Sequence, residues 1–233
     1  MAKIAALRLI FARAHSDFVA CAPTSNVAHF RVPRKHARMH NLRFEISGFQ
    51  IQPMPRRIAF LRAINVGGHF VTMAALRGHF KKLGLEQVET FINSGNVIFT
   101  TSAKNDAALE RKIEAHLEKA MGYEVKTFLR SEAEIAAIAR YKPFDEARMQ
   151  AALTLSVAFL AAPLDAAAQE LLMEMRTDAD DFHVHGREMY WLCTRKQTES
   201  KFSNARFERV LKLSATFRGL NTIARLAEKY SGH

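Results

Sequence analysis

The sequence predicts an α+β protein with two ferredoxin-like halves, at residues 56–130 and about 150–220, followed by a C-terminal helix. Strand-like and helix-like apolar patterns follow one another in the order β-α-β-β-α-β and then nearly repeat. Turns rich in Asn and Gly, at Asn65–Gly68 and Asn93–Asn96, separate the patterns of the first half. No long linker lies between the halves, so we expect them to pack together.

The first half carries clear start and stop signals for its elements. Thr72 is a suitable N-cap for the first helix, and Gly84 is placed to end it. The hairpin turn Asn93–Asn96 has the residues that tight turns prefer. The expected elements are a strand at 56–63, a helix at 73–83, strands at 88–92 and 97–101, a helix from about 105 to 122 and a strand at 124–130.

The second half repeats this order more loosely. Ser131 and Glu134 form a capping box that opens a connecting helix. The expected elements are then a strand at 155–159, a helix after Asp165, a hairpin of 182–185 and 189–193, a helix from about 203, a short strand at 215–217 and a closing helix through 223–230. Right-handed crossovers would place both helices of each half on one face of its sheet.

Composition and charge exclude some classes of protein. No run of 18 apolar residues exists, so we expect no membrane-spanning segment. The formal charge is +11, but residues 1–53 hold eight Lys and Arg against two acids, so the remaining chain is only mildly basic. Only Cys193 of the two cysteines lies in the part expected to fold, which favours a reducing cytoplasm.

Residues 1–53 lack sustained periodicity and are expected to be a disordered or misassigned N-terminal extension. Met54 stands directly before the first good strand and is our hypothesis for the natural start. Two other interpretations stay open for this Arg-rich segment, namely an organellar transit peptide and an arm that binds nucleic acid.

The polar loops hold the least generic residues of the chain. Backbone N–H groups after the first strand could bind a phosphate or carboxylate, although the loop matches no dinucleotide or P-loop pattern and can equally be a tight turn. The guanidinium of Arg218 suits an anion, but it can also pair with a structural carboxylate. The candidate ligand-binding residues are Arg62, Asn65, Gly67, Gly68, Ser94, Asn96, Lys201 and Arg218.

Two other patterns were weighed against simpler interpretations. His183 and His185 share one strand face and could bind zinc with a nearby aspartate, but an ordinary strand beside an acidic loop is favoured. Tyr190 and Trp191 could stack on bases, but core packing is favoured because the RNP1 pattern is absent. The sequence therefore predicts no metal site and no cofactor, and no catalytic residue is identified.

Several of these segments resemble the bacterial family known as domain of unknown function 1697, over about residues 55–230. Two positions depart from the family pattern: Ala63 stands where members carry Gly, and Gly219 stands where they carry Asn. The resemblance implies a two-part α+β protein whose N-terminus falls near Met54, with no established activity. The matching stretches are Phe60–Gly68, Met73–Gly84, Thr90–Phe99, Gly186–Trp191, Ser200–Lys201 and Thr216–Thr222.

The function expected from these observations is a cytoplasmic module that binds an anionic small molecule or nucleic acid. A small enzyme of unknown reaction is one alternative, which the lack of a recognisable nucleophile–base pair disfavours. A structural or oligomer-forming protein is the other. The sequence leaves the oligomeric state open.

Overall fold

The computed structural model of this 233-residue chain describes residues 54–65, 68 and 70–230. Residues 1–53, which the sequence predicts to be an extension, lie outside the described residues. That expectation therefore stays a prediction. Both predicted halves belong to the same compact unit. Among the described helices, none combines the length and the apolar character that crossing a membrane requires.

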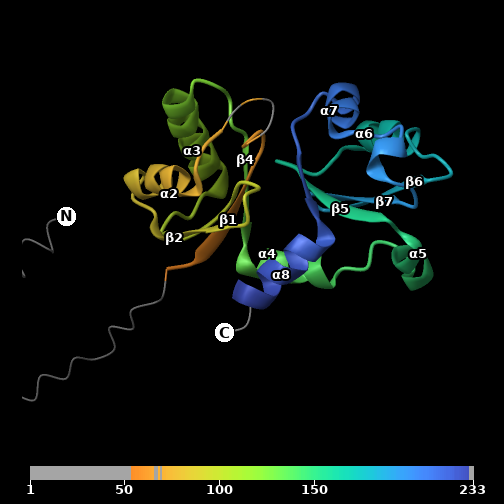
Figure 1. Ribbon diagram of the computed structural model, residues 1–233, viewed down its shortest axis with the longest axis horizontal. Coiled ribbons are helices and arrows are strands. Elements are labelled where there is room, and N and C mark those ends of the chain that lie inside the picture. Colours follow the sequence, from red (N-terminus) through yellow and green to blue (C-terminus); the bar gives the residue numbers. More distant parts are fainter. Residues whose placement is uncertain (1–53, 66–67, 69, 231–233) are drawn as a thin grey trace, which may run out of the picture. The chain divides into compact units, whose positions relative to one another are not determined.

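The first half has the predicted β-α-β-β-α-β order. Its strands form one antiparallel sheet in the order β2-β3-β1-β4, which is the ferredoxin-like arrangement. Helices α2 and α3 lie against one face of this sheet (Figure 1). The elements are β1 (Arg56–Leu61), α2 (Met73–Lys82), β2 (Glu86–Phe91), β3 (Asn96–Thr100), α3 (Asp106–Met121) and β4 (Thr127–Ser131).

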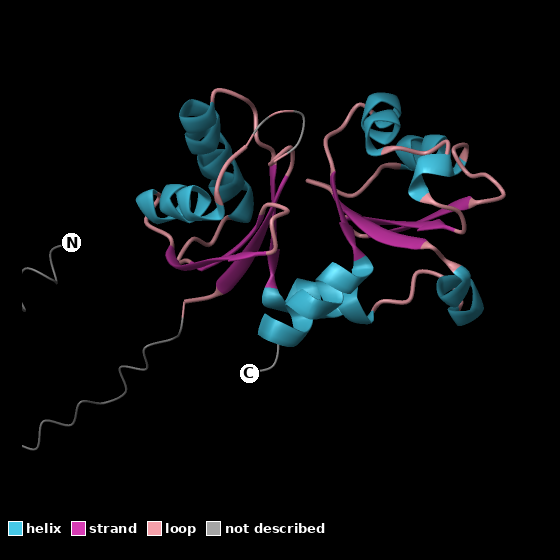
Figure 2. Cartoon of the chain, viewed as in Figure 1, coloured by secondary structure: helices cyan, strands magenta, loops and turns pink. Residues whose placement is uncertain are grey.

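The second half repeats the topology, with a sheet in the order β6-β7-β5-β8. Figure 2 shows the strands of both sheets in magenta and the helices in cyan. The two ferredoxin-like halves predicted from the sequence are therefore confirmed. The elements are β5 (Thr154–Phe159), α6 (Ala166–Met173), β6 (Asp180–His185), β7 (Glu188–Cys193), the 3-10 helix η1 (Gln197–Glu199), α7 (Asn204–Leu211) and β8 (Thr216–Gly219).

Three helices lie outside the two repeated units, namely α4 (Glu132–Arg140), α5 (Glu146–Ala151) and α8 (Leu220–Tyr230). The predicted capping box is present, because the Ser131 and Glu134 side chains each accept from the other's backbone N–H. Helix α5 was not predicted, since its six residues are too few to carry a helical apolar stripe. The domain division predicted at residues 130 and 131 falls within β4 and stays a prediction.

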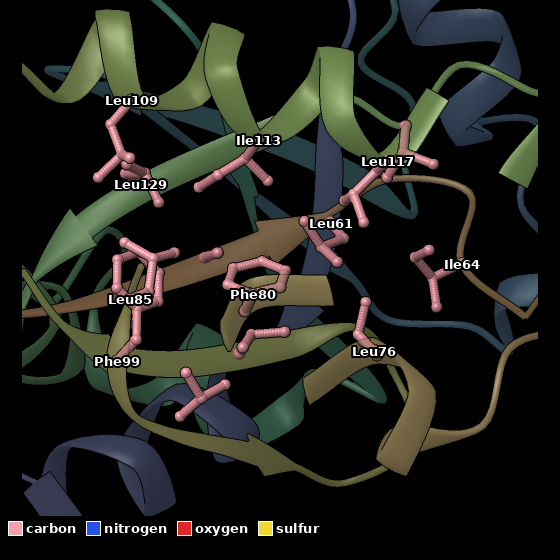
Figure 3. Close-up of a cluster of buried hydrophobic side chains, with 14 residues drawn as sticks. Leu61, Ile64, Leu76, Phe80, Leu85, Phe99, Leu109, Ile113, Leu117 and Leu129 are labelled. Carbon is pink, nitrogen blue, oxygen red and sulfur yellow. The ribbon is translucent and has the colours of Figure 1, made fainter. Parts of the chain in front are cut away.

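Alternation along each strand divides the apolar side chains between separate cores. Ala59 and Leu61 of β1 face α2 and α3, where they join the cluster drawn in Figure 3. Phe60 faces the opposite way and stacks on Phe159 of β5, with ring centroids 3.9 Å apart. This middle core holds residues from both sheets and from α4 and α8, so it joins the halves.

A buried ion pair also joins the halves. The Arg130 side chain is fully buried and donates from Nε to Glu188 at 2.7 Å. Its NH2 group donates to the carbonyl oxygens of Leu160 and Arg187. Loss of one partner would leave a buried charge unpaired, which typically costs about 3–5 kcal/mol. The junction between the halves is therefore a stable framework for any site built on it.

Candidate functional site

A pocket of about 480 Å³ lies at the junction, and we call it the arginine pocket. The loop after β1 and the β2–β3 turn supply its wall from the first half. The N-terminal part of α7, the segment after it and β8 supply the wall from the second half. Its lining residues are Leu61, Arg62, Ala63, Ile64, Asn65, Asn93, Ser94, Asn204, Ala205, Glu208, Ala215, Thr216, Phe217 and Arg218.

Arg218 uses all five of its N–H groups on neutral oxygen atoms. Nε donates to Oδ1 of Asn96 at 2.6 Å, and NH2 donates to the carbonyl oxygens of Leu61 at 2.9 Å and Ser94 at 2.6 Å. NH1 donates to the Thr216 hydroxyl and to the carbonyl oxygen of the next residue. No carboxylate of the described residues pairs with this guanidinium.

Among the described polar groups, only the dipoles of neutral oxygen-bearing groups stabilise the charge of Arg218. Desolvation lowers the pKa of Arg218 to about 10, and the guanidinium remains protonated at neutral pH. A hydrogen bond saturates a donor without cancelling the net charge, so the pocket wall keeps one positive charge without a counter-ion. Such a charge attracts an anion even though its own N–H groups are occupied.

Arg62 is in the opposite situation, because a carboxylate neutralises it. Its Nε and NH2 donate to the two oxygens of Glu208 at 2.6 and 2.7 Å, a bidentate ion pair between the halves. The hydrogen bond with Glu208 raises the pKa of Arg62. Glu208 also accepts from the backbone N–H of Ala215 at 2.9 Å. The pocket thus has two arginines and one glutamate, and its net charge comes from Arg218.

Ser94 and Asn96 act as the support for Arg218. The Asn96 side chain is fully buried and donates to the Ser94 hydroxyl oxygen at 2.8 Å and to the carbonyl oxygen of Phe91. Between them, Gly95 has φ +69°, and a Cβ there would lie 3.1 Å from Ile64 Cβ. Only glycine fits this close approach of the turn to the loop after β1.

The loop after β1 is held in an uncommon backbone conformation. Asn65 has φ +57°, and its Oδ1 accepts from the backbone N–H of Val71 at 2.8 Å. Ala63 has φ +62°, and Ile92 in the adjacent turn has φ +51°. Left-handed conformations of non-glycine residues cost about 1–3 kcal/mol each and cluster at functional sites.

The other predicted residues are not brought into the pocket wall. Gly68 is exposed with φ +86°, and Gly67 lies outside the described residues. Lys201 is exposed and does not line the pocket, although its carbonyl oxygen accepts from Arg206. Of the eight predicted residues, the pocket wall contains Arg62, Asn65, Ser94 and Arg218, with Asn96 behind Arg218.

Among the polar residues that line the pocket, Asn93, Asn204, Glu208 and Thr216 had no predicted role in ligand binding. Asn93 was noted only as part of a turn. Asn204 and Glu208 lie on one face of α7, where polar residues normally face solvent. No sequence signal places that face against the loop after β1, because the contact depends on how the two halves pack.

The alternative sites weighed in the sequence have structural explanations. The described residues contain no group of three His, Cys, Asp or Glu that could hold a metal ion. His183 instead hydrogen-bonds the Tyr141 hydroxyl at 2.7 Å, and His185 stacks on the same ring. Tyr190 and Trp191 are fully buried, so neither ring can stack on a base.

Comparisons with known proteins agree with the fold and name no activity. The profile of a family described as "Protein of unknown function (DUF1697)" matches residues 54–190, which confirms the resemblance seen in the motifs. The structure is similar to that of the conserved bacterial protein SP0830 from Streptococcus pneumoniae, with a TM-score of 0.59 and 26% identity. That match covers 76% of this chain and 99% of the other. No curated protein matches the chain.

Proposed function

The chain belongs to the DUF1697 family of proteins of unknown function, and from the geometry of its arginine pocket we propose that it binds a small anionic ligand there. The observation that carries the proposal is the charge of Arg218, which lines the pocket and has no carboxylate partner among the described residues. An anion in the pocket would supply the missing counter-charge.

The strength of this attraction is sufficient for binding. Two unit charges 4 Å apart attract each other by about 4 kcal/mol at an effective dielectric of 20. Because Arg218 is fixed by five hydrogen bonds, little conformational entropy is lost when a ligand arrives. A ligand would also reverse part of the desolvation that lowers the pKa of Arg218.

Unused hydrogen-bond donors support a ligand rich in oxygen. The side-chain amides of Asn93 and Asn204 line the pocket and have no partner in the described part of the chain. Within the described residues, Asn65 uses its Oδ1 atom and leaves its NH2 group available, and Arg62 leaves NH1 available. A phosphate or carboxylate accepts several such bonds at once.

The same groups favour binding over catalysis. The carboxylate of the pocket, Glu208, is engaged by Arg62 and Ala215, so it is poorly placed to act as a general base. The Ser94 hydroxyl accepts from Asn96 and has no base beside it in the described residues. Nucleic acid is less favoured than a small molecule, because the buried Tyr190 offers no stacking surface.

The test introduces a negative charge at the pocket wall without disturbing the fold. Asn204 is exposed in the first turn of α7, where Asp is well tolerated because of the helix dipole. Asn204→Asp should weaken binding of inorganic phosphate or malonate by about tenfold or more, which corresponds to about 1.4 kcal/mol. Titrations followed by NMR chemical shifts measure the affinity.

The matched control is Asn221→Asp, the same change in the first turn of α8, at a residue that does not line the pocket. It should leave the affinity unchanged. Titration with a single-stranded oligonucleotide completes the set. The proposal is wrong if neither small anion binds saturably, if both variants bind equally well, or if the oligonucleotide alone binds.

A further inference from the structure

A second pocket, of about 580 Å³, is also built from both halves, and we call it the glutamate pocket. It shares no lining residue with the arginine pocket. Helix α3 and strand β4 form one side, and the segments after β5 and α7 form the other. Its lining residues are Ala107, Glu110, Arg111, Glu114, Lys126, Thr127, Phe128, Leu160, Ala161, Ala162, Pro163, Leu164, Asp165, Ala168, Leu211, Leu213 and Ser214.

Two glutamates one turn apart on α3 hold the free edge of β4. Glu114 Oε1 accepts from the backbone N–H of Thr127 at 2.9 Å, and Glu110 Oε1 accepts from that of Leu129 at 2.7 Å. Because β4 is an edge strand, these N–H groups would otherwise lack partners. Both carboxylates are thereby fixed beside β4 at the pocket.

The two carboxylates differ in their counter-ions. The Lys126 ammonium lies 3.6 Å from Glu114 and 3.0 Å from Glu124, so Glu114 has a cation beside it. No Lys, Arg or His of the described residues forms an ion pair with Glu110. Desolvation raises the pKa of Glu110, although the hydrogen bond from Leu129 and the charges of Arg130 and Arg187 act in the opposite direction. Its Oε2 atom accepts no hydrogen bond from the described chain.

The other charged residues do not cancel this excess. Arg111 and Asp165 complete the charged lining, and Asp165 caps α6 through the backbone N–H of Ala168. With Glu110, Glu114 and Lys126 they leave one net negative charge in the pocket.

A buried hydroxyl beside the two carboxylates is not available to a ligand. Thr127 is 3% exposed and lines the glutamate pocket. Its Oγ1 atom has almost no accessible surface and has no hydrogen-bond partner among the described residues. An unsatisfied buried hydroxyl typically costs about 1–3 kcal/mol, and this cost belongs to the packing of β4 rather than to the pocket.

Most of the remaining wall of the pocket is apolar. Phe128 and, apart from Ser214, the remaining lining residues of the second half provide aliphatic and aromatic carbon rather than polar groups. These wall residues are Phe128, Leu160, Ala161, Ala162, Pro163, Leu164, Ala168, Leu211 and Leu213. A ligand that fills the pocket must therefore combine a small polar head with an apolar chain.

We propose that the glutamate pocket binds a protonated aliphatic amine, whose ammonium group donates to Glu110 while its chain lies on the apolar wall. An ammonium group has three donors and one positive charge, which matches the unused Oε2 atom of Glu110 and the net negative charge of the wall. Each buried methylene of the chain contributes about 0.8 kcal/mol.

The experiment compares n-alkylammonium ions, from methylammonium to hexylammonium, with n-alkanols of the same length. Affinities are measured by calorimetry and by NMR chemical shifts on the full chain. The ammonium ions should bind more tightly as the chain lengthens, and each should bind about tenfold more tightly than the matching alkanol. Equal binding of the two series would overturn the proposal.

Variants then locate the ammonium group. Glu110→Gln keeps an oxygen for the Leu129 N–H but removes the charge, and should weaken hexylammonium binding by about tenfold. Glu118→Gln is the matched control, because Glu118 lies on the same helix, is exposed and is absent from the pocket. Equal affinity in Glu110→Gln and Glu118→Gln would contradict the proposal.

Thr127→Val tests whether the ammonium group uses Glu110 rather than the buried hydroxyl beside it. It removes a hydroxyl that has no partner among the described residues, so the folded protein should be as stable as the wild type or more stable. It should leave the affinities for the alkylammonium ions and the alkanols unchanged. Asn204→Asp should not change amine affinity, which separates this site from the arginine pocket. Weaker amine binding in Thr127→Val would place the ammonium elsewhere.

Discussion

Arg218 in the arginine pocket and Glu110 in the glutamate pocket each form no ion pair with the described residues, but the two charges have opposite sign and different support. Arg218 donates five hydrogen bonds to neutral oxygens, and three of them join β8 to the end of β1, to the β2–β3 turn and to the start of β3. Glu110 accepts one hydrogen bond, from the edge of β4. An unpaired charge can therefore hold several segments of the fold together, as Arg218 does, or make a single bond to it, as Glu110 does.

The largest expected effect on stability comes from removing the charge of Arg218. Arg218→Leu should lower the free energy of unfolding by about 3–5 kcal/mol, because the buried Asn96 amide and the carbonyl oxygens of Leu61 and Ser94 lose their donors. Urea denaturation measures the change. Arg225→Leu is the matched control, since Arg225 is exposed and lies over the Phe91 ring. Its loss should cost about 1 kcal/mol or less.

A loss below about 1 kcal/mol in Arg218→Leu would remove the distinction between the pockets. It would mean that the five bonds are replaced by water without penalty. The pocket would then be a surface that rearranges easily. The lowered pKa of Arg218 would no longer indicate a charge that is held in one position.

A smaller effect is expected from doubling the charge of the arginine pocket. Glu208→Gln keeps an oxygen for the Ala215 N–H but leaves Arg62 without its counter-charge. Phosphate affinity should rise by about tenfold, or about 1.4 kcal/mol, and stability should fall by about 1 kcal/mol because the ion pair is partly exposed. Phosphate titration and urea denaturation measure the two changes.

Glu228→Gln controls for the loss of one negative charge from the chain as a whole. Glu228 is exposed on α8 and does not line either pocket. Its phosphate affinity should equal that of the wild type. If both glutamine variants raise phosphate affinity equally, the attraction is a property of the basic chain and does not come from the pocket.

Much of the fold was predictable because its signals are local. Thr72 caps α2 and Gly84 follows its end with φ +80°, and both residues were recognised as boundary signals in the sequence. Asp165 caps α6 in the same way. The order of the elements then determines the ferredoxin-like topology, since right-handed crossovers leave few alternatives. Helix α5 was not predicted, because it is too short to show the periodic apolar pattern of a helix.

The site was predictable only in part, because its chemistry depends on pairing between the halves. Sequence alone identified Arg62 and Arg218 as anion-binding candidates and could not rank them. The structure distinguishes them, since Glu208 lies 146 residues after Arg62 and neutralises it while Arg218 has only neutral partners. Glu110 gave no signal at all, because it resembles any polar residue on a helix surface.

The smallest effect concerns the glutamate pocket and appears as a dependence of stability on pH. Burial raises the pKa of Glu110 above its ordinary value of 4.5, so the folded protein holds this proton at a pH where the unfolded chain has lost it. Stability contributed by the protonated form is therefore lost as pH rises from about 4.5 through the folded pKa. Glu110→Gln should lack this decline and should be as stable as the wild type at pH 7, or slightly more stable.

The measurement is the difference in free energy of unfolding between wild type and Glu110→Gln from pH 4 to pH 7. Subtraction removes the contribution of His79. Desolvation and the neighbouring His116 lower the pKa of His79. Its contribution to stability therefore rises with pH up to about 6.5, opposite in direction to that of Glu110. A difference that grows in favour of the wild type with rising pH would show a carboxylate stabilised by its surroundings. Glu110 would then stabilise the fold as Arg218 does. The two pockets would no longer differ in how their unpaired charges are supported.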